Sequence, residues 1–460
     1  MLQQACTAGY DQPAQHGSPL GPPARRDLWL VRAVLIGGGI LALAVVTGYV
    51  CGAITDPLLL AGWITGTGVL LWRFHAVHTS SRFLRHPAAP GRIVAIVSAR
   101  EPEGEDLHAC VWSILNQRGV VVDQVHVVDD GSTSRPAQPF PHPRVRWHRK
   151  AYGGRRAAEA YVLARLGRGD WDFVLTLDGD AVLDERAVEY QLRAFSLPEV
   201  TATTGTVTVR NDRERLLTRI VDLHLGASFG RRANRPSRGT PEVIPGVPVL
   251  CRADVAFEYR DRRLACGPDG AAHSLSVYAA RHGGVAGVRE AVTWIREPAG
   301  AATTYRQWLR WSTAWWTSSP VLADMGRWTL PRVLGLARSL AESPAIGCLL
   351  VALAAVLGGQ GGPWWRPVAA YAALHLMARY ATTGLYLLER PETYRRRGSW
   401  SWLLLIPAEA VFGLLFAVPV KCAALLTLCR RGRRIRRRPV PFAEPATGAI
   451  YHSGRIGEGA

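Results

Sequence analysis

The stretch FVLTLDGD, residues 173–180, predicts a buried strand that carries two acids to the edge of a sheet. Its apolar run Phe173–Asp178 has the length and composition of a strand. Asp178 and Asp180 lie one residue apart at the point where the chain must turn. Carboxylates in this arrangement suit Mg²⁺ or Mn²⁺, which take one or two of them together with phosphate oxygens of a substrate. An ordinary solvated turn is the alternative.

Strand-like and helix-like segments alternate on both sides of this stretch, from Arg92 to about Arg289. The predicted strands and helices are, in chain order, Ile93–Ser98, Glu105–Asn116, Val120–Asp130, Arg155–Leu166 and Phe173–Asp178. Such alternation indicates an α/β fold with a mostly parallel sheet that helices cover on both faces. Ligands of such sheets bind at the carboxyl ends of the strands.

Two further groups fall at that binding edge. Asp129 and Asp130 end a predicted strand just before Gly131, and their carboxylates can accept hydrogen bonds from a ribose or a base. A turn is again the alternative. The segment Gly-Gly-Arg-Arg at 153–156 opens a helix, where free N–H groups and a guanidinium favour a phosphate. A plain helix start fits that segment equally well.

Two more groups follow along the chain. Asp269 precedes a predicted helix and is by itself interpreted as a helix cap, with a general base as the other possibility. Gln307, Arg310 and Trp311 share one face of a helix because they are three and four residues apart. An amide, a guanidinium and an indole suit a diphosphate and a sugar ring. The alternative is a tryptophan belt at a membrane interface, to which we assign Trp308, Trp315 and Trp316.

Apolar segments precede the polar block. Residues 1–27 are rich in Gln, Pro, Gly and Ala and are expected to be disordered. The runs Ala33–Ile54 and Pro57–Trp72 predict two transmembrane helices within residues 28–72. Arginines flank this pair but are missing from its linker, which puts the polar block in the cytoplasm. Paired arginines before the first run also resemble an export signal, but the run is longer than such a signal requires.

The chain turns apolar again after Trp316. Residues 329–342 predict an interfacial helix with one apolar and one basic face. Residues 343–429 predict three to four transmembrane helices, which gives five or six in all, and the basic residues 430–460 predict a cytoplasmic tail. Arg379 lies midway along one span and is expected to face protein or a watery passage, because a charge facing lipid is costly. A segment lying at the interface is the alternative.

Charge and cysteine content narrow the function classes. The net charge is +19, and only two of the 55 basic residues are lysines. Such a charge suits nucleic acid, anionic lipid or a phosphate-bearing substrate. The arginines are spread along the chain and no nucleic-acid-binding signature is present, so nucleic acid is excluded as a partner. The eight cysteines show neither Cys-x-x-Cys nor zinc spacing and are interpreted as reduced and structural.

The order and spacing of these motifs resemble the processive family 2 glycosyltransferases, such as the hyaluronan, cellulose, chitin and poly-N-acetylglucosamine synthases. The motifs are Asp-Asp-Gly-Ser at 129–132, Gly-x-Arg at 153–155, Asp-x-Asp at 178–180, Gly-x-Asp at 267–269 and Gln-x-x-Arg-Trp at 307–311. Glu297-Pro298 is a supporting match. The chain looks most like the hyaluronan-synthase-type group over about residues 30–430. The resemblance implies a cytoplasmic GT-A domain at 89–316, between N- and C-terminal transmembrane helices in the cell membrane.

The resemblance also implies roles for single residues. Nucleotide sugar would be bound by Asp129, Asp130, Arg155, Asp178 and Arg310; Mg²⁺ or Mn²⁺ by Asp178 and Asp180; the acceptor by Gln307 and Trp311; and Asp269 would be the catalytic base. The implied partners are a UDP-sugar donor, a polysaccharide or lipid-linked acceptor, and membrane lipids. The implied reaction is an inverting, metal-dependent transfer of sugar to a growing polysaccharide, coupled to export.

Departures from the family pattern leave the sugar and the processivity open. The first strand ends in Ser-Ala-Arg-Glu at 98–101, where the family usually has a Pro and an Asn-Glu. A non-processive transferase acting on a membrane lipid is the second reading, and Gln-x-x-Arg-Trp argues against it because that element accompanies polymer-making members. A transporter or an inactive binding protein is the third. It is disfavoured because transporter spans recur as repeats through the chain and because the acids needed for chemistry are present.

Overall fold

The computed structural model describes residues 83–101, 104–133, 141–229, 248–261 and 282–318, with single residues and short runs within 275–280 and 379–426. The predicted segments 1–27, 28–72, 329–342 and 430–460 lie outside the described residues, as do most of 343–429 and Asp269. Of the helices that are described, none is both long and apolar enough to cross a membrane.

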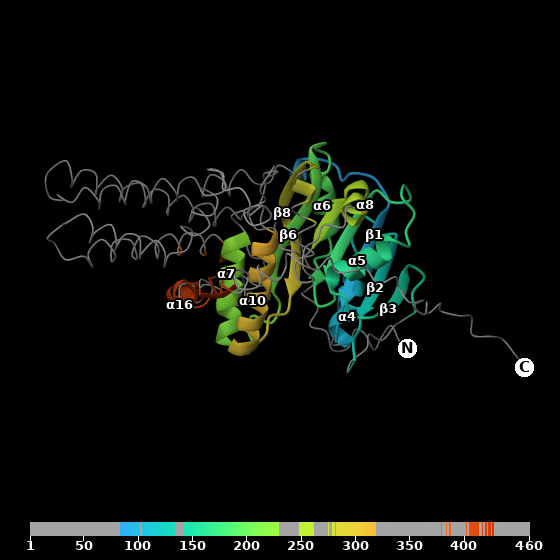
Figure 1. The fold of residues 1–460 in the computed structure, drawn as a ribbon. Coiled ribbons are helices and arrows are strands. Elements are labelled where there is room, and N and C mark those ends of the chain that lie inside the picture. Colours follow the sequence, from blue (N-terminus) through green and yellow to red (C-terminus); the bar gives the residue numbers. More distant parts are fainter. Residues whose placement is uncertain are drawn as a thin grey trace, which may run out of the picture.

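A sheet with the strand order β3-β2-β1-β4-β7-β6-β8-β5 forms the centre of the described structure (Figure 1). Its parallel half consists of β1 (Ile93–Ala99), β2 (Gln124–Asp130), β3 (Val145–Lys150) and β4 (Phe173–Asp178). Its mixed half consists of β5 (Val182–Leu183), β6 (Val200–Val209), β7 (Val249–Arg252) and β8 (Gly284–Ile295). β7 runs antiparallel to β4 and β6, and β5 runs antiparallel to β8, whereas β6 and β8 are parallel. The mostly parallel sheet expected from the sequence is thus confirmed for its first four strands.

Helices cover both faces of this sheet, as the alternating pattern predicts. α4 (Gly104–Leu115) and α6 (Ala187–Ala194) contribute to the hydrophobic cluster on one face. α5 (Arg155–Leu163) and α8 (Ala253–Asp261) contribute to the cluster on the other. A short 3-10 turn, η1 (Phe83–Arg85), precedes β1.

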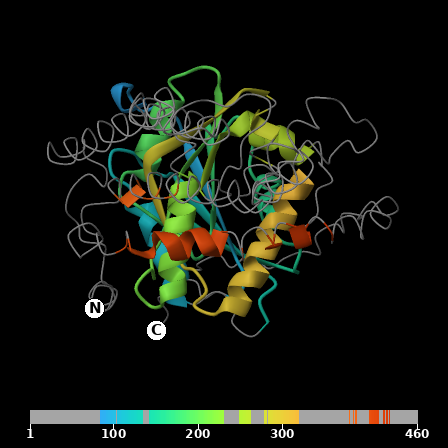
Figure 2. The same cartoon turned by 90° about the vertical axis from the view of Figure 1, so that its left-hand side faces the viewer.

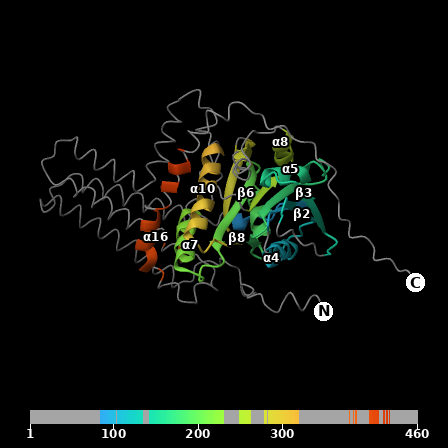
Figure 3. The same ribbon diagram turned by 60° about the horizontal axis from the view of Figure 1, so that its bottom comes forward.

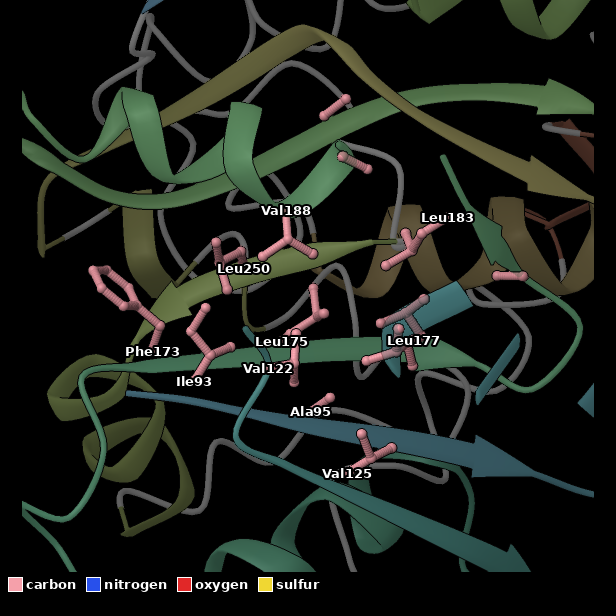
Figure 4. Packing of buried hydrophobic residues seen from close by; sticks show 14 of the residues in the cluster. Ile93, Ala95, Val122, Val125, Phe173, Leu175, Leu177, Leu183, Val188 and Leu250 are labelled. Atoms are coloured by element: carbon pink, nitrogen blue, oxygen red, sulfur yellow. The ribbon is translucent and has the colours of Figure 1, made fainter. Parts of the chain in front are cut away.

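The central strand β1 separates the two clusters by simple alternation. Ile93, Ala95 and Val97 belong to the first cluster, whereas Val94 and Ile96 belong to the second. Successive side chains of a strand point to opposite faces, so a fully apolar strand must be buried on both. Figure 4 shows the first cluster, in which labelled side chains of β1 and β4 lie side by side. Each fully buried aliphatic side chain there stabilises the fold by about 1.5–3 kcal/mol. This packing holds the ends of the strands in fixed positions.

A third group of helices lies beyond β6 and β8: α7 (Leu216–Phe229), α10 (Ala301–Ser318) and α16 (Ile406–Phe412) (Figures 1 and 3). Their apolar side chains, together with Val209 of β6, form a separate cluster that includes Val221, Trp308 and Phe412. Figure 2 shows α16 in red, crossing α7 in green. The helix that carries Gln-x-x-Arg-Trp is therefore packed in the same cluster as parts of the chain about a hundred residues further on.

Candidate active site

Strand pairing brings the two acidic pairs to neighbouring positions. Ala99 of β1 pairs with Asp129 of β2, and Ser98 of β1 pairs with Asp178 of β4. The chain leaves β1 for β2 and β3 on one side and returns to β4 on the other. Open α/β sheets bind ligands outside the carboxyl ends of the strands at such a reversal of strand order.

Arg155, the first residue of α5, joins the helix to the end of β4. Its Nη1 donates to Asp178 Oδ1 at 2.7 Å and its Nη2 to Thr176 Oγ1 at 3.2 Å, while its Nε donates to Glu159 Oε1 at 2.9 Å. The Arg155 side chain is largely buried, whereas 43% of the Asp178 side chain is exposed. One guanidinium therefore neutralises an acid that is open to solvent at the expected binding edge.

Asp180 lies just beyond the end of β4. The N–H of Gly179 donates to Ser98 O at 3.0 Å, and a Cβ on Gly179 would lie 3.0 Å from that of Ala99, which makes the turn tight. Shielding from water by the surrounding protein, and next the negative charge of Asp178, raise the pKa of Asp180 to about 7. The Asp180 side chain also reaches the surface, beside that of Asp178. Two carboxylates this close resist ionising together.

A divalent cation would relieve this repulsion. Both acids offer hard oxygen ligands, the type that Mg²⁺ and Mn²⁺ prefer. Among the described residues, no third His, Cys, Asp or Glu joins them to form a metal-binding cluster. The remaining ligands would then be water and substrate phosphate oxygens, which is usual for Mg²⁺. The residues present fit the predicted metal.

Asp130 holds the glycine turn that precedes α5. Gly153 N donates to its Oδ1 at 3.0 Å and Gly154 N to its Oδ2 at 2.6 Å, and Lys150 Nζ lies 2.6 Å from Oδ1. Gly154 has a φ of 82°, a conformation that glycine adopts without strain. Asp130 therefore positions the start of α5, and hence Arg155. A direct contact with a nucleotide, as predicted, would use the acceptor position on Oδ2 that these bonds leave open.

Asp129 is also buried and also organises the backbone. Its Oδ1 accepts a hydrogen bond from Ser132 N at 3.0 Å, and its Oδ2 lies 3.8 Å from Arg149 Nε. The intervening Gly131 has a φ of 73°, and a Cβ there would lie only 2.6 Å from Tyr152 N. The Asp-Asp-Gly-Ser motif thus shapes the edge of the sheet against the segment that carries Tyr152.

Tyr152 and Arg100 form an exposed platform that the sequence analysis missed. Tyr152 is 54% exposed, and the guanidinium carbon of Arg100 lies 4.0 Å from its ring centroid. A flat aromatic ring next to Gly131 offers a stacking surface for a base. The available signal was the position of Tyr152, directly before the glycine pair at 153–154.

On α10, the three residues predicted to share a face are differently exposed. Arg310 and Trp311 are exposed, with 38% of Trp311 accessible, and Gln307 is half-buried. Gln307 Nε2 lies 3.5 Å from Glu297 Oε1. The guanidinium and the indole are available to a ligand, and Gln307 is tied to the chain that leads into the helix.

Trp308 corrects one prediction. It is only 7% exposed, and its ring centroid lies 5.3 Å from that of His224 and 5.4 Å from that of Phe412. Its assignment to a membrane-interface belt is therefore wrong, because the ring packs against α7 and α16.

Glu297 is a buried acid to which the sequence analysis gave no role. Asn211 fixes its backbone from both sides: Nδ2 donates to Glu297 O at 2.8 Å, and Glu297 N donates to Oδ1 at 3.0 Å. Glu297 is 1% exposed, and within the part of the chain that the structure describes its Oε2 has no hydrogen-bond partner. Burial, followed by the negative charge of Asp180, raises the pKa of Glu297 to about 8. The acid therefore lies within electrostatic reach of Asp180 and in contact with Gln307. The only earlier signal was its place in the Glu-Pro pair before α10.

Comparison with known proteins agrees with this site. Residues 90–314 match the family model described as "Glycosyltransferase like family 2". A hyaluronan synthase of Streptococcus pyogenes is 28% identical over 211 residues, which cover 42% of this chain and 49% of the relative. An N-acetylglucosaminyltransferase of Rhizobium sp. is 32% identical over 124 residues, covering 25% of this chain and 27% of the relative. The chain spans about half the length, or less, of these curated relatives.

A solved structure is similar at a greater distance. It is the mannosyltransferase PcManGT from Pyrobaculum calidifontis in complex with GDP-Man and Mn²⁺, with a TM-score of 0.39 and 15% identity over 83% of this chain and 99% of that chain. A likeness this distant carries no weight for the donor or the metal of this chain. The family match is different, since it runs from just before β1 into α10 and so includes the whole sheet and the acids at its strand ends. This part of the chain is a glycosyltransferase domain with a GT-A-like α/β fold, and it belongs to glycosyltransferase family 2.

Proposed function

We propose that the chain is an inverting, metal-dependent glycosyltransferase of the cell membrane. It moves sugar from a UDP-sugar to the end of a growing polysaccharide, in step with export, and its catalytic domain faces the cytoplasm. The main support for the proposal is the position of Glu297. Burial, followed by the charge of Asp180, raises the pKa of Glu297, and Glu297 also contacts Gln307. The Asp-x-Asp edge and the Gln-x-x-Arg-Trp helix can therefore serve one substrate.

The donor half of the site lies at the ends of β2 and β4. A bound Mg²⁺ or Mn²⁺, held by Asp178 and Asp180, supplies positive charge for the leaving diphosphate. Arg155 has five N–H donors and can bind a phosphate oxygen while it keeps contact with the protein. Tyr152 offers the base a stacking surface. Arg310, exposed on α10, adds a second cation for the diphosphate.

The transfer itself is a single displacement. The acceptor hydroxyl oxygen forms a bond to the anomeric carbon while the bond from that carbon to the diphosphate oxygen breaks, so the configuration inverts. The electron pair of the broken bond leaves on UDP, and the hydroxyl proton passes to a carboxylate. Asp178 and Asp180 would be engaged with the cation, and Asp130 is engaged with the glycine turn. The family resemblance gives the base role to Asp269.

The acceptor half of the site is the exposed face of α10. The Trp311 indole can stack on a sugar ring, and the Gln307 amide can hydrogen-bond to its hydroxyls. A flat ring with neighbouring amide donors suits the end of a polysaccharide better than a lipid chain.

The test is synthesis by membranes that contain the protein. Radiolabelled UDP-sugars are supplied singly and in pairs, and the products are separated by size on a gel. A polymer whose length grows with time supports the proposal. A product that carries one sugar and extracts with lipid would favour the non-processive reading, and transfer from none of the donors, although UDP binds, would overturn both.

The proposed location has a separate test. A tag placed after Ala460 is expected to be accessible only after the cells are opened, because the arginines in 430–460 are drawn to anionic lipid on the cytoplasmic side. Accessibility from outside intact cells would indicate an odd number of spans.

A further inference from the structure

A buried ion pair lies behind the Gln-x-x-Arg-Trp helix. Arg379 Nε donates to Glu409 Oε2 at 2.8 Å, and Arg379 Nη2 also donates to Glu409 Oε1. Glu409, on α16, is fully buried, and Arg379 is 8% exposed. The expectation that Arg379 faces protein agrees with this contact. The pair is internally neutral, which is the condition under which two buried charges are tolerated.

His224 of α7 extends this pair toward the catalytic domain. Its Nδ1 lies 2.7 Å from Glu409 Oε1. Because an ionised carboxylate can only accept, Nδ1 carries the hydrogen of this bond. The bond fixes both the tautomer and the orientation of the His224 ring.

The ring of His224 lies against Trp308 of α10. Their centroids are 5.3 Å apart, and Phe412, three residues after Glu409 on α16, meets Trp308 edge to face at 5.4 Å. Among the described residues, the Trp308 indole N–H finds no hydrogen-bond partner, and the ring is held by packing. Trp308 follows Gln307 directly, and its ring lies 6.2 Å from that of Trp311. Contacts therefore run without a gap from Glu409 to the proposed acceptor face.

A second anchor joins Tyr386 to α7. Tyr386 OH donates to Asp222 Oδ1 at 3.0 Å, and Val209 N donates to the same oxygen at 3.0 Å. The Tyr386 ring lies so close to Gly226 that a Cβ there would not fit. Tyr386 thus provides a control in the same segment as Arg379, since its hydroxyl donates to Asp222 of α7 rather than to His224 or Glu409.

We propose that Glu409 and His224 are positioning residues for the acceptor face of α10. Arg379 and Glu409 lie in parts of the sequence expected to be transmembrane. His224 contacts both Glu409 and Trp308, so the position of Glu409 determines where the Trp308 ring packs. A displacement of those segments therefore changes how Gln307 and Trp311 hold the polymer end. This inference rests on the proposed function for the role of Gln307 and Trp311, but not for the chain of contacts.

The test compares His224→Phe with Tyr386→Phe in the full-length protein. His224→Phe keeps an aromatic ring against Trp308 and removes the bond to Glu409. It is expected to shorten the polymer and to raise the KM for an oligosaccharide acceptor by at least about tenfold, the order expected for one lost hydrogen bond to an ionised group. Hydrolysis of the donor is expected to stay within about twofold, because the Asp-x-Asp edge is untouched. Tyr386→Phe is expected to lower the melting temperature without changing product length.

A spectroscopic readout makes the result independent of catalysis. The protein is labelled with fluorotryptophan, and the Trp308 and Trp311 resonances are assigned with Trp308→Phe and Trp311→Phe. Both resonances are expected to move in His224→Phe and to stay in place in Tyr386→Phe. Glu409→Gln, which keeps the shape of the side chain, is expected to move them in the same way.

Two outcomes would overturn the inference. One is a Trp311 resonance that stays in place in both His224→Phe and Glu409→Gln. The other is an equal effect of His224→Phe and Tyr386→Phe on product length, which would reduce the ion pair to a support for folding. A protein that makes no polymer but shows the expected resonance shifts would count against the proposed function alone.

Discussion

The Arg155 guanidinium lies 2.7 Å from the Asp178 carboxylate, so a cation of the protein already balances the acid that is proposed to hold the metal. The same guanidinium also reaches Thr176 and Glu159. When a metal-bound diphosphate binds, the metal would balance the charge of Asp178, and Arg155 would be able to balance the charge of the diphosphate instead.

Replacing Arg155 by Lys should impair catalysis although the charge is kept. An ammonium cannot reproduce the planar fork that joins Asp178, Thr176 and Glu159. We expect kcat/KM to fall by about tenfold to a hundredfold, or about 1.4–2.7 kcal/mol. Arg165→Lys is the control, since Arg165 lies just beyond the other end of α5 and donates to Tyr161 O. Equal losses in the two variants would show that the effect is only on the helix.

Asp180→Asn should abolish tight binding of Mn²⁺. The substitution removes the negative charge that repels Asp178, and it also removes one of the two ionised metal ligands. Isothermal titration of Mn²⁺ into the protein with UDP is expected to show affinity reduced by at least about tenfold. Asp184→Asn, four residues further on, serves as the control. Full transfer activity in excess chelator would contradict a role for the metal.

Glu297→Gln should be far less damaging than Glu297→Ala. With a pKa near 8, the Glu297 carboxyl is mostly protonated at pH 7, and Gln reproduces a neutral group of the same size. We expect kcat within about threefold of the parent for Gln and about tenfold lower for Ala, which leaves Gln307 without its neighbour. Steady-state kcat and KM at pH 7 check this. If Gln were as harmful as Ala, an ionised carboxylate would be required instead.

The His126–His148 pair should make the domain sensitive to acid. His126 Nδ1 and His148 Nε2 are 2.9 Å apart inside the sheet. Burial, followed by neighbouring positive charge, lowers the pKa of His126 to about 3 and that of His148 to about 4. The unfolded chain therefore binds protons first as the pH falls below about 6.5, so the free energy of unfolding decreases from there towards pH 4.

Melting curves at pH 7, 6, 5 and 4 measure this effect. The double variant His126→Leu, His148→Leu removes both titrating groups and should flatten the decrease. His86→Gln, before β1, is the control and should leave it in place. An unchanged slope in the double variant would assign the acid sensitivity to other groups.

Asp269→Asn should stop transfer while donor binding survives. Asn keeps the size of the side chain and can still cap a helix, but it cannot take a proton. A positioned general base contributes about a hundredfold or more, so polymer synthesis should fall by at least that factor while the Kd for UDP-sugar stays the same. Asp261→Asn is a neighbouring control. Elongation at the parent rate in Asp269→Asn would show that the base lies elsewhere.

Three of the four parallel strands were predictable because their signals are local, whereas β3 (Val145–Lys150) was missed. Phe173–Asp178 is bounded by polar residues on both sides, and β4 has those same limits. The predicted strand Val120–Asp130 is too long, since β2 begins only at Gln124. Asp123 precedes it and accepts a hydrogen bond from Ile93 N at 2.7 Å, which fixes where the strand pairing starts. The short β7 runs antiparallel because it pairs with β4 on one side and β6 on the other. No local sequence pattern predicts this direction.

The candidate site shows the same limit. The sequence places Asp130 at a strand end, but it cannot tell that two glycine N–H groups more than 20 residues away will use both carboxylate oxygens. Helical spacing gives the face that Trp308 occupies, but not that α7 and α16 cover it. The bond from His224 to Glu409 spans 185 residues, beyond the reach of any pattern.

The position of β1 between β2 and β4 has a consequence for changes in chain length. β1 contributes only backbone pairing and burial, yet Ala99 and Ser98 set where Asp129 and Asp178 stand relative to each other. One residue inserted within this strand would shift the paired ends by about 3.3 Å and turn each later side chain to the opposite face. The loops that join the strands can vary in length. The length of β1, in contrast, sets the spacing of the acids that face the substrate, and we expect no insertion or deletion within it to be tolerated.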